Sequence, residues 1–218
     1  MRYKSANIKI NAKALKKSLN EGLVGSVNVK KAAFKAAEKL AQDAKDEMLG
    51  AFEASPVTRE LDAGAENTVN FSKNLIGIGH GEGSLFGFIG FGESDNPIGL
   101  VREYLNASGK IFKTPKVIKS GGKISYRYRV QIPNTKDLFA MTPMPWEGGR
   151  SWVRSIEKGI SGLGYYLLSN SPVSRSGQGV QASHRLRKAV YRPTKYMSSI
   201  INAYSKYLQT GKKSKLKK

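Results

Sequence analysis

The chain of 218 residues contains no cysteine and only two histidines, His80 and His184. The missing thiols exclude disulfides and thiolate metal ligands, in keeping with a reducing compartment. Two histidines alone do not make a zinc site, so we predict neither a metal nor a cofactor. No apolar run approaches eighteen residues, and the N-terminus lacks the apolar core of a secretory signal. We therefore expect a soluble protein that is made in the cytoplasm and has no membrane contact.

Acidic residues are scarce in the second half of the chain. Residues 1–104 hold 14 Lys and Arg against 13 Asp and Glu, whereas residues 105–218 hold 23 against 3. The first part therefore carries a net charge of +1 and the second a net charge of +20. Folding does not require this imbalance, because like charges on a compact domain repel one another. It predicts an anionic partner, either nucleic acid or an acidic protein surface, and the sequence does not choose between them.

The length allows one well-buried core with flanking arms. We predict an N-terminal arm over residues 1–26, which could instead be an edge strand. A single α+β domain is expected over residues 27–208, with a mobile loop near residues 170–182. Residues 209–218 are expected to form a basic tail, since GKKSKLKK closes the chain.

The firmest structural prediction is a long amphipathic helix from Val29 to Phe52. Its apolar residues recur at steps of three and four, the period of a helix that buries one face. Asn28 is expected to cap its N-terminus, and Ser55-Pro56 should end it, because a residue before proline avoids the helical region.

Further helices are predicted near the C-terminus. One is expected from Ser151 to about Ile160, followed by a strand or a helical continuation over residues 165–168. Ser183 should cap a short helix that runs to Ala189. Thr194 should cap a last helix with one apolar side, formed by Met197, Ile200, Ile201, Tyr204 and Leu208.

Four strands are predicted in the middle of the chain. Two short strands should surround the turn HGEG, at residues 74–79 and 84–92, since glycine-bearing apolar runs suit strands with bulges. Two more are expected at residues 111–118 and 123–132, separated by Ser120-Gly121-Gly122. The fold class is therefore α+β: a long N-terminal amphipathic helix packed on a small, mainly antiparallel sheet, with C-terminal helices and extended basic arms.

Residues 123–132 have two different faces. Ile124, Tyr126, Tyr128 and Val130 or Ile132 alternate with Ser125, Arg127, Arg129 and Gln131. Because side chains alternate across a strand, one face is apolar or aromatic and the other carries arginine.

Catalytic and nucleotide-binding motifs fail on spacing. GIGHGEG does not satisfy G-x-G-x-x-G, and SGGKIS is not a P-loop. Ser84 near His80 and Ser183 near His184 do not sit in G-x-S-x-G, so they are interpreted as ordinary polar loop residues. Only three carboxylates follow residue 104, Asp137, Glu147 and Glu157, too few for a clustered acidic site. We predict that the protein is not an enzyme.

Basic residues carry a stronger signal than any catalytic pattern. Arginine binds phosphate or carboxylate with two parallel hydrogen bonds. No motif for reading DNA sequence is present, so any contact with nucleic acid should be to its backbone. The alternative is a solvated surface that improves solubility. The predicted contact residues are Arg127, Arg129, Arg150, Arg154, Arg175, Arg185, Arg187, Lys188, Arg192 and Lys195.

Aromatic residues near these arginines could stack bases or anchor a protein interface. The aromatic set is Tyr126, Tyr128, Trp146, Trp152, Tyr165, Tyr166, Tyr191 and Tyr196. Interface anchoring is favoured, because Trp, Tyr and Arg dominate protein interfaces. The predicted subunit-interface residues are Met141, Met144, Trp146, Trp152, Phe86 and Phe88.

One motif resembles a known family. The segment AFEASPVTREL, residues 51–61, ends a long helix with Pro56, Val57, Thr58 and Leu61 ahead of a glycine-bearing region. It resembles the head-to-tail connector and tail-completion (neck) proteins of long-tailed double-stranded-DNA bacteriophages, whose motif is Pro-Val-x-Thr-Gly-x-Leu. Here Arg59-Glu60 replaces the glycine of that motif. The resemblance covers roughly residues 30–132.

The resemblance implies a structural virion protein that forms a ring, joins head and tail, and is assembled in the host cytoplasm. It implies an α+β subunit with arms that reach neighbouring virion proteins and no catalytic activity. The basic half would then face packaged DNA or acidic surfaces of adjacent ring proteins, and both alternatives stay open. A nucleic-acid-binding protein that acts alone and ignores sequence is the other hypothesis.

Overall fold

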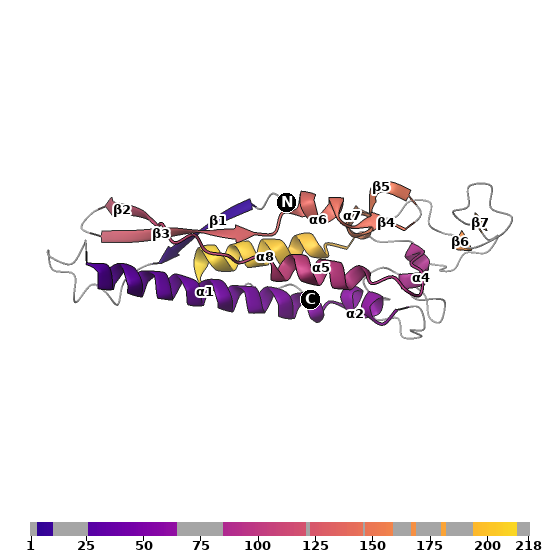
Figure 1. Cartoon of the computed structure of the whole chain (residues 1–218), viewed down its shortest axis with the longest axis horizontal. Coiled ribbons are helices and arrows are strands. Elements are labelled where there is room, and N and C mark those ends of the chain that lie inside the picture. Colours follow the sequence, from indigo (N-terminus) through magenta and orange to yellow (C-terminus); the bar gives the residue numbers. More distant parts are fainter. Residues whose placement is uncertain are drawn as a thin grey trace. The chain divides into compact units, whose positions relative to one another are not determined.

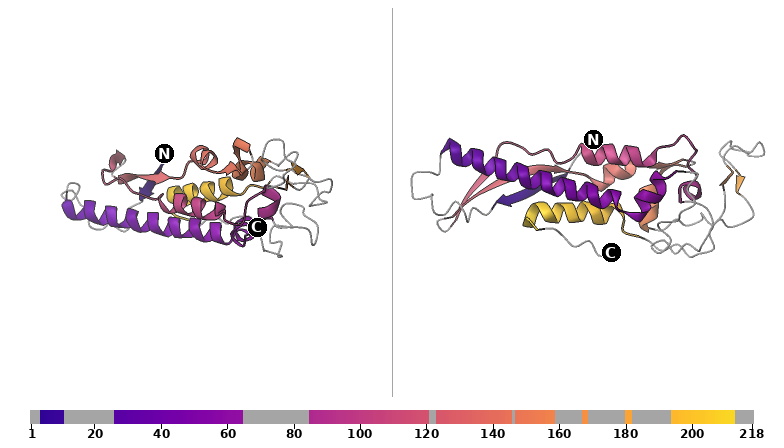
Figure 2. Two further views of the ribbon diagram at one scale, coloured as in Figure 1. Left: turned by 45° about the vertical axis from the view of Figure 1, so that its right-hand side comes forward. Right: turned by 90° about the horizontal axis from the view of Figure 1, so that it is seen from below.

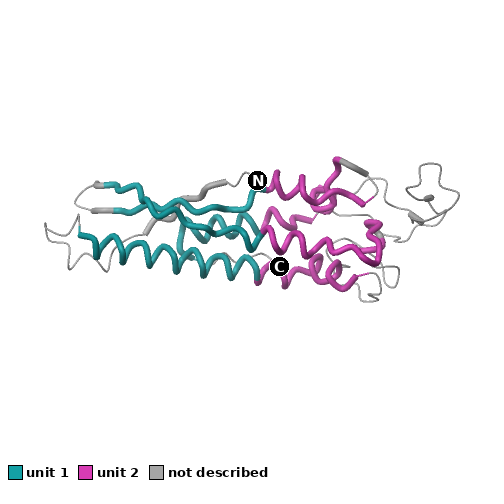
Figure 3. Tube along the Cα trace, in the orientation of Figure 1, with its two compact units in different colours: residues 1–49, 105–134, 200–218 teal, residues 50–104, 135–199 magenta. Residues whose placement is uncertain are grey.

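The computed structural model describes residues 4–10, 26–64, 85–120, 123–145, 147–158, 167–168, 180–181 and 194–212. The chain divides into two compact units, coloured separately in Figure 3. Unit 1 comprises residues 1–49, 105–134 and 200–218, and unit 2 comprises residues 50–104 and 135–199. The α+β class is confirmed. The domain limits expected at residues 26 and 208 stay predictions.

Unit 1 contains a three-stranded antiparallel sheet with the order β1-β3-β2 (Figure 1). Its strands are β1 (Lys4–Ile10), β2 (Lys116–Ser120) and β3 (Lys123–Ile132). The central strand β3 matches the predicted bounds, while β2 begins later than expected. Ile111 makes an isolated bridge to Val130. Of the two alternatives for the first 26 residues, the edge strand is observed at Lys4–Ile10.

The long helix α1 (Val27–Glu53) confirms the firmest prediction. It begins before Asn28, so the predicted cap is wrong; the carbonyl of Ser26 accepts the amide of Lys30 instead, at 3.2 Å. Ser55-Pro56 ends the helix as expected, because Ser55 is extended and Pro56 opens α2 (Pro56–Asp62).

The interior of unit 1 joins α1 to the sheet. Val29, Ala33 and Ala37 from α1 pack with Tyr126 and Tyr128 from β3, and Phe34 meets the Tyr128 ring edge-on at 5.7 Å. The small alanines let the helix approach the tyrosine face of the strand closely. Figures 1 and 2 show α1 and the unit 1 part of α8 (Met197–Thr210) on the same side of the sheet.

Unit 2 is built mainly from short helices. They are α2, α4 (Leu85–Ile89), α5 (Pro97–Asn106, of which residues 97–104 belong here), α6 (Thr135–Ala140) and α7 (Trp152–Lys158). Two small antiparallel ribbons accompany them: β4 (Pro143–Met144) with β5 (Glu147–Ser151), and β6 (Leu167–Leu168) with β7 (Val180–Gln181). Large side chains fill the interior, among them Trp152, Phe52 and Phe86.

The strand predicted over residues 84–92 is wrong, because Leu85–Ile89 forms the helix α4. Its first amide, that of Leu85, donates to Oε1 of the buried Glu60 at 2.7 Å. This contact between residues 25 positions apart satisfies an otherwise unpaired amide at the helix start. The companion strand at 74–79 and its turn lie outside the described residues.

The C-terminal helices are confirmed at α7 and α8, and all five predicted apolar residues of α8 are buried. The predicted cap Thr194 is wrong, since α8 begins three residues later. Instead, Glu157 Oε1 accepts the amide of Ser198 at 2.5 Å. Residues 167–168 form the strand alternative of the 165–168 prediction. The helix from Ser183 and most of the loop near 170–182 lie outside the described residues.

Candidate anion-binding surface

The charge of the chain is divided between the two units. Unit 1 holds 24 Lys and Arg against 5 Asp and Glu, a net charge of +19. Unit 2 holds 13 against 11, a net charge of +2. The asymmetry along the sequence is thus also an asymmetry between the two units, and unit 1 should attract anions more strongly than unit 2.

The sheet of unit 1 turns its two faces to different environments. Tyr126 and Tyr128 are buried toward α1, as the alternation predicts, and Val130 at the next alternate position is also buried. Arg129 is exposed and Arg127 is half-exposed, because residues of odd number on β3 point the other way. Both arginines therefore share the predicted face of the strand.

The register adds two lysines that the sequence does not place. Lys9 on β1 and Lys116 on β2 occupy the positions directly opposite Arg127. Three basic residues thus form one cross-strand row, and no Asp or Glu occurs in any of the three strands. Like charges at opposite positions destabilise a sheet. We call the surface of Lys116, Arg127 and Arg129, with the half-buried Ser125 and Gln131, the basic face.

Arg129 is held by an aromatic neighbour. Its guanidinium carbon lies 5.1 Å from the ring centre of Phe112, a cation–π arrangement. The amide of Phe112 also donates to the carbonyl of Arg129 at 2.9 Å, so the ring is positioned by the backbone of the strand it contacts. The stacked guanidinium is preorganised and keeps its edge available to an oxyanion.

Other predicted contact residues are not part of this surface. Arg150 lies on β5, Arg154 lies on α7 and Lys195 precedes α8; all three are exposed and belong to unit 2. Arg150 is therefore on a strand and Arg154 on a helix, although both lie within two residues of Trp152. The remaining predicted contacts lie outside the described residues: Arg175, Arg185, Arg187, Lys188 and Arg192.

The predicted subunit-interface residues are mostly interior. Phe86, Met144 and Trp152 are each at most 3% exposed, so in the folded chain they fill the core of unit 2 and present no surface to a neighbour. Phe91 links two of them, since its ring lies 5.2 Å from that of Phe86 and 5.9 Å from that of Trp152. Met141 is half-buried. Trp146 and the side chain of Phe88 lie outside the described part.

The carboxylates of unit 2 serve its own structure. Arg102 forms ion pairs with Glu53 at 2.7 Å and with Asp62 at 3.1 Å. The hydrogen bond with Glu53 is the main cause that raises the pKa of Arg102. Together with Glu60 and Glu157 at helix starts, these contacts connect α1, α2, α4, α5, α7 and α8.

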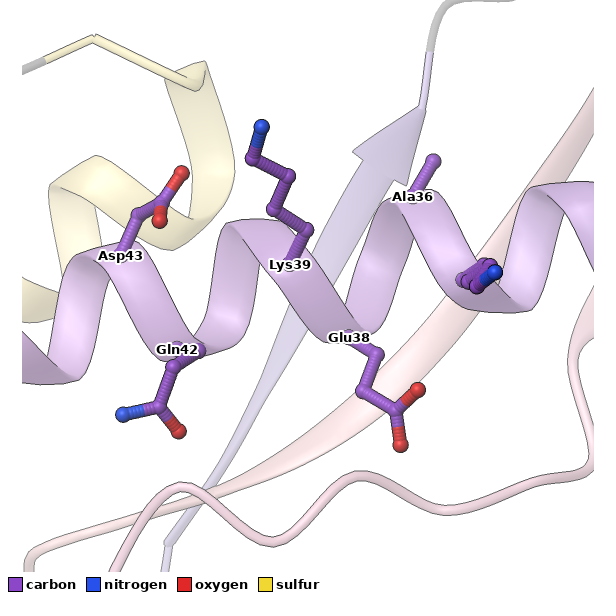
Figure 4. Close-up of a pocket in the computed structure, with 6 residues that line it drawn as sticks. Ala36, Glu38, Lys39, Gln42 and Asp43 are labelled. Atoms are coloured by element: carbon purple, nitrogen blue, oxygen red, sulfur yellow. The ribbon is translucent and has the colours of Figure 1, made fainter.

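The surface hollow on α1 does not have the form of a ligand site. A hollow of about 610 Å³ lies on the exposed side of α1 (Figure 4). All of its lining residues come from this one helix, and Lys39 and Asp43 point away from Glu38 and Gln42, so they do not converge on a ligand. Within the described ranges, no three His, Asp or Glu residues gather to hold a metal, and no helix could span a membrane.

Comparison with protein families, curated proteins and solved structures finds no match for this chain.

Proposed function

We propose that this chain is a structural protein of a tailed-bacteriophage particle, a ring-forming neck or tail-completion component that joins head and tail without catalysis. One observation carries the proposal: unit 1 concentrates a net charge of +19 and aligns basic residues across strands that hold no acid. A protein that is complete by itself gains nothing from this arrangement, because like charges repel. A surface completed by an anionic neighbour explains it.

The motif that carries the family resemblance has a clear structural role. Pro56 opens α2 directly after α1, and Val57, Thr58 and Leu61 are buried. Thr58 shares a hydrogen bond of 2.6 Å with the hydroxyl of Tyr196, which lies 138 residues further along the chain. A motif that fixes how a long helix turns into the next helix can recur wherever that fold recurs. This supports the resemblance on physical grounds.

The proposed partners are further copies of the chain in a ring, neighbouring virion proteins, and packaged DNA touched through its backbone. The protein would be located in the virion after assembly in the host cytoplasm. The alternative function, a nucleic-acid-binding protein that acts alone, is favoured by the basic face specifically. It differs from the first proposal in requiring no virion neighbour.

The test is whether the chain is part of the particle. Mass spectrometry of purified particles of the encoding phage should detect the chain in a fixed copy number, and electron microscopy of the purified chain or its neck complexes should show rings. Its deletion should leave filled heads without tails. Particles that lack the chain, together with normal tail attachment in the deletion, would contradict the proposal and favour the stand-alone alternative.

A further inference from the structure

We propose that the basic face of unit 1 binds the sugar-phosphate backbone of duplex DNA, without regard to sequence. The inference rests on the proposed function, since it names the anionic partner of that same surface. Net charge alone does not distinguish DNA from an acidic protein surface as the partner; the features below favour DNA.

The first argument is the chemical composition of the face. Outward positions on β3 hold Ser125, Arg127, Arg129 and Gln131, and the exposed Lys116 stands opposite Arg127. Arginine, lysine, serine and glutamine are the side chains that donate to phosphate oxygens. Acids, which would repel phosphate, are missing from all three strands. Basic and hydrogen-bonding side chains therefore occupy the outward positions of β3.

The second argument is what a protein partner would need. Protein interfaces have an apolar centre rich in aromatic residues, and lysine is depleted there. Beside the basic face, the ring of Phe112 is exposed but already lies against the guanidinium of Arg129, and Ile118 is half-buried. The cross-strand row contains two lysines and one arginine. This composition suits phosphates better than an acidic protein.

The third argument separates duplex from single strand. Proteins that bind single strands stack successive bases on several exposed aromatic rings. The tyrosines of β3 point inward and are at most 4% exposed, so they cannot serve this purpose. The basic face offers charge on two adjacent strands, β2 and β3, which lie about 5 Å apart. The phosphates of duplex DNA can contact these basic side chains while the bases stay stacked inside the duplex.

The expected binding follows from counterion release. If Lys116, Arg127 and Arg129 each neutralise one phosphate, the logarithm of the affinity should fall with the logarithm of the salt concentration with a slope of about 3. The sequence of the duplex should have no effect, because contacts to the backbone carry no sequence information.

The test compares two triple variants with equal charge. One is Lys116→Gln, Arg127→Gln, Arg129→Gln on the basic face. The matched control is Lys31→Gln, Lys35→Gln, Lys39→Gln, on exposed positions of α1 in the same unit. Fluorescence anisotropy with a labelled 25-base-pair duplex is measured from 50 to 300 mM salt, and circular dichroism checks that both variants are folded.

The basic-face variant should lower the salt slope by about 2 to 3 and weaken binding more than about tenfold at 0.1 M salt. The α1 control should retain most of the slope. Equal losses in both variants would overturn the inference, because net charge rather than the face would then explain binding. If the triple variant fails to fold, Arg129→Gln alone should lower the slope by about 1.

Two further arms separate the possible ligands. Poly-glutamate of matched charge should compete weakly with the duplex; competition as strong as that of unlabelled duplex would indicate an acidic protein partner and overturn the inference. Tighter binding to a single strand than to duplex would overturn it as well. Since incorporation of the chain into particles is measured separately, a chain that enters particles but binds no DNA refutes this inference and leaves the proposed function standing.

Discussion

The two units use charged residues in opposite ways. In unit 2, Glu60 and Glu157 accept hydrogen bonds from backbone amides at helix starts, and Glu53 and Asp62 form ion pairs with Arg102. These charged side chains therefore contact other groups of the same unit. In unit 1, the strands carry lysine and arginine and no acid, with Lys9, Arg127 and Lys116 in one row. The comparison teaches that these four acids of unit 2 contribute to its own structure, whereas the like charges of the unit 1 strands have no acid beside them in those strands, which is why we propose an anionic partner for them.

The largest expected effect concerns the interior of unit 2. Trp152→Ala should lower the free energy of unfolding by about 3–5 kcal/mol, because this side chain is 2% exposed and meets Phe91 edge-on. Chemical denaturation measures the loss. Arg154→Ala, on the exposed side of the same helix, should change stability by less than about 0.5 kcal/mol. If the Trp152→Ala protein is as stable as the unchanged protein but does not assemble, Trp152 acts at a subunit interface, as the sequence predicts.

A buried carboxylate should come next. Glu60→Ala leaves the amide of Leu85 without its acceptor inside unit 2, and should cost about 2–3 kcal/mol. The exposed Glu103→Ala is the control and should be near neutral. Hydrogen exchange at α4 should accelerate in the first variant. Unchanged stability would mean that the acids of unit 2 are not structural.

Two buried tyrosines, one in each unit, make a matched pair. Tyr196 in unit 2 shares its hydroxyl hydrogen bond with Thr58, whereas the hydroxyl of Tyr204 in unit 1 is buried and has no hydrogen-bond partner among the described residues. Tyr196→Phe should therefore cost about 1 kcal/mol, and Tyr204→Phe should be neutral or stabilising. Thr58→Val combined with Tyr196→Phe should cost less than the sum of the single changes. If Tyr196→Phe and Tyr204→Phe lower the free energy of unfolding equally, the predicted difference between the two tyrosines is wrong.

The same pair predicts a pH dependence. Burial raises the pKa of both hydroxyls above the usual value near 10. Below about pH 10 both states are neutral and stability is unaffected; above it the unfolded chain ionises while the folded protein does not. The free energy of unfolding should thus fall as the pH rises above about 10. Each Phe variant should fall less steeply, and an unchanged slope would contradict the assignment.

Arg102→Gln should have a smaller effect. Its side chain is 34% exposed, and ion pairs at that exposure contribute about 0.5–1 kcal/mol. Thermal unfolding at low and high salt measures the change, which should shrink as salt is added. A loss of several kcal/mol would show that this cluster is far more important to unit 2 than its exposure suggests.

The smallest expected effect has the opposite sign. Lys116→Gln removes one member of the like-charged row in unit 1 and should raise stability by a few tenths of a kcal/mol at low salt. The gain should vanish at high salt, because the charges are exposed. Destabilisation by Lys116→Gln would mean that the row contributes to folding, and the contrast between the units would be lost.

Sequence periodicity predicted the elements whose pattern is long. The steps of three and four along α1 and the alternation along β3 extend over ten residues or more, so helix and strand are distinguished. The five residues of α4 are too few for that distinction, and the hydrogen bond from the Leu85 amide to Glu60 involves a residue that is distant in the sequence. The helix α5 was missed, although Ile98, Val101, Tyr104 and Leu105 carry the spacing of a buried helical face.

Only the part of the candidate site that depends on local periodicity was predicted from the sequence. Alternation places Arg127 and Arg129 on one face of β3 from local sequence alone. Lys9 and Lys116 join them through strand pairing, and Lys9 lies 118 positions from Arg127. Register between distant strands depends on tertiary packing, which no local pattern contains. Trp152 lies in the interior of unit 2 and not on its surface, because large aromatic residues also fill cores, and burial is a property of the fold.

An experimental map of the chain in its assembled state tests the central claim most directly. The account predicts ordered density of an anionic partner within hydrogen-bonding distance of Arg127 and Arg129, with DNA phosphates as the specific expectation. A map in which this face of the sheet points into open solvent, remote from any neighbouring subunit or nucleic acid, would contradict it.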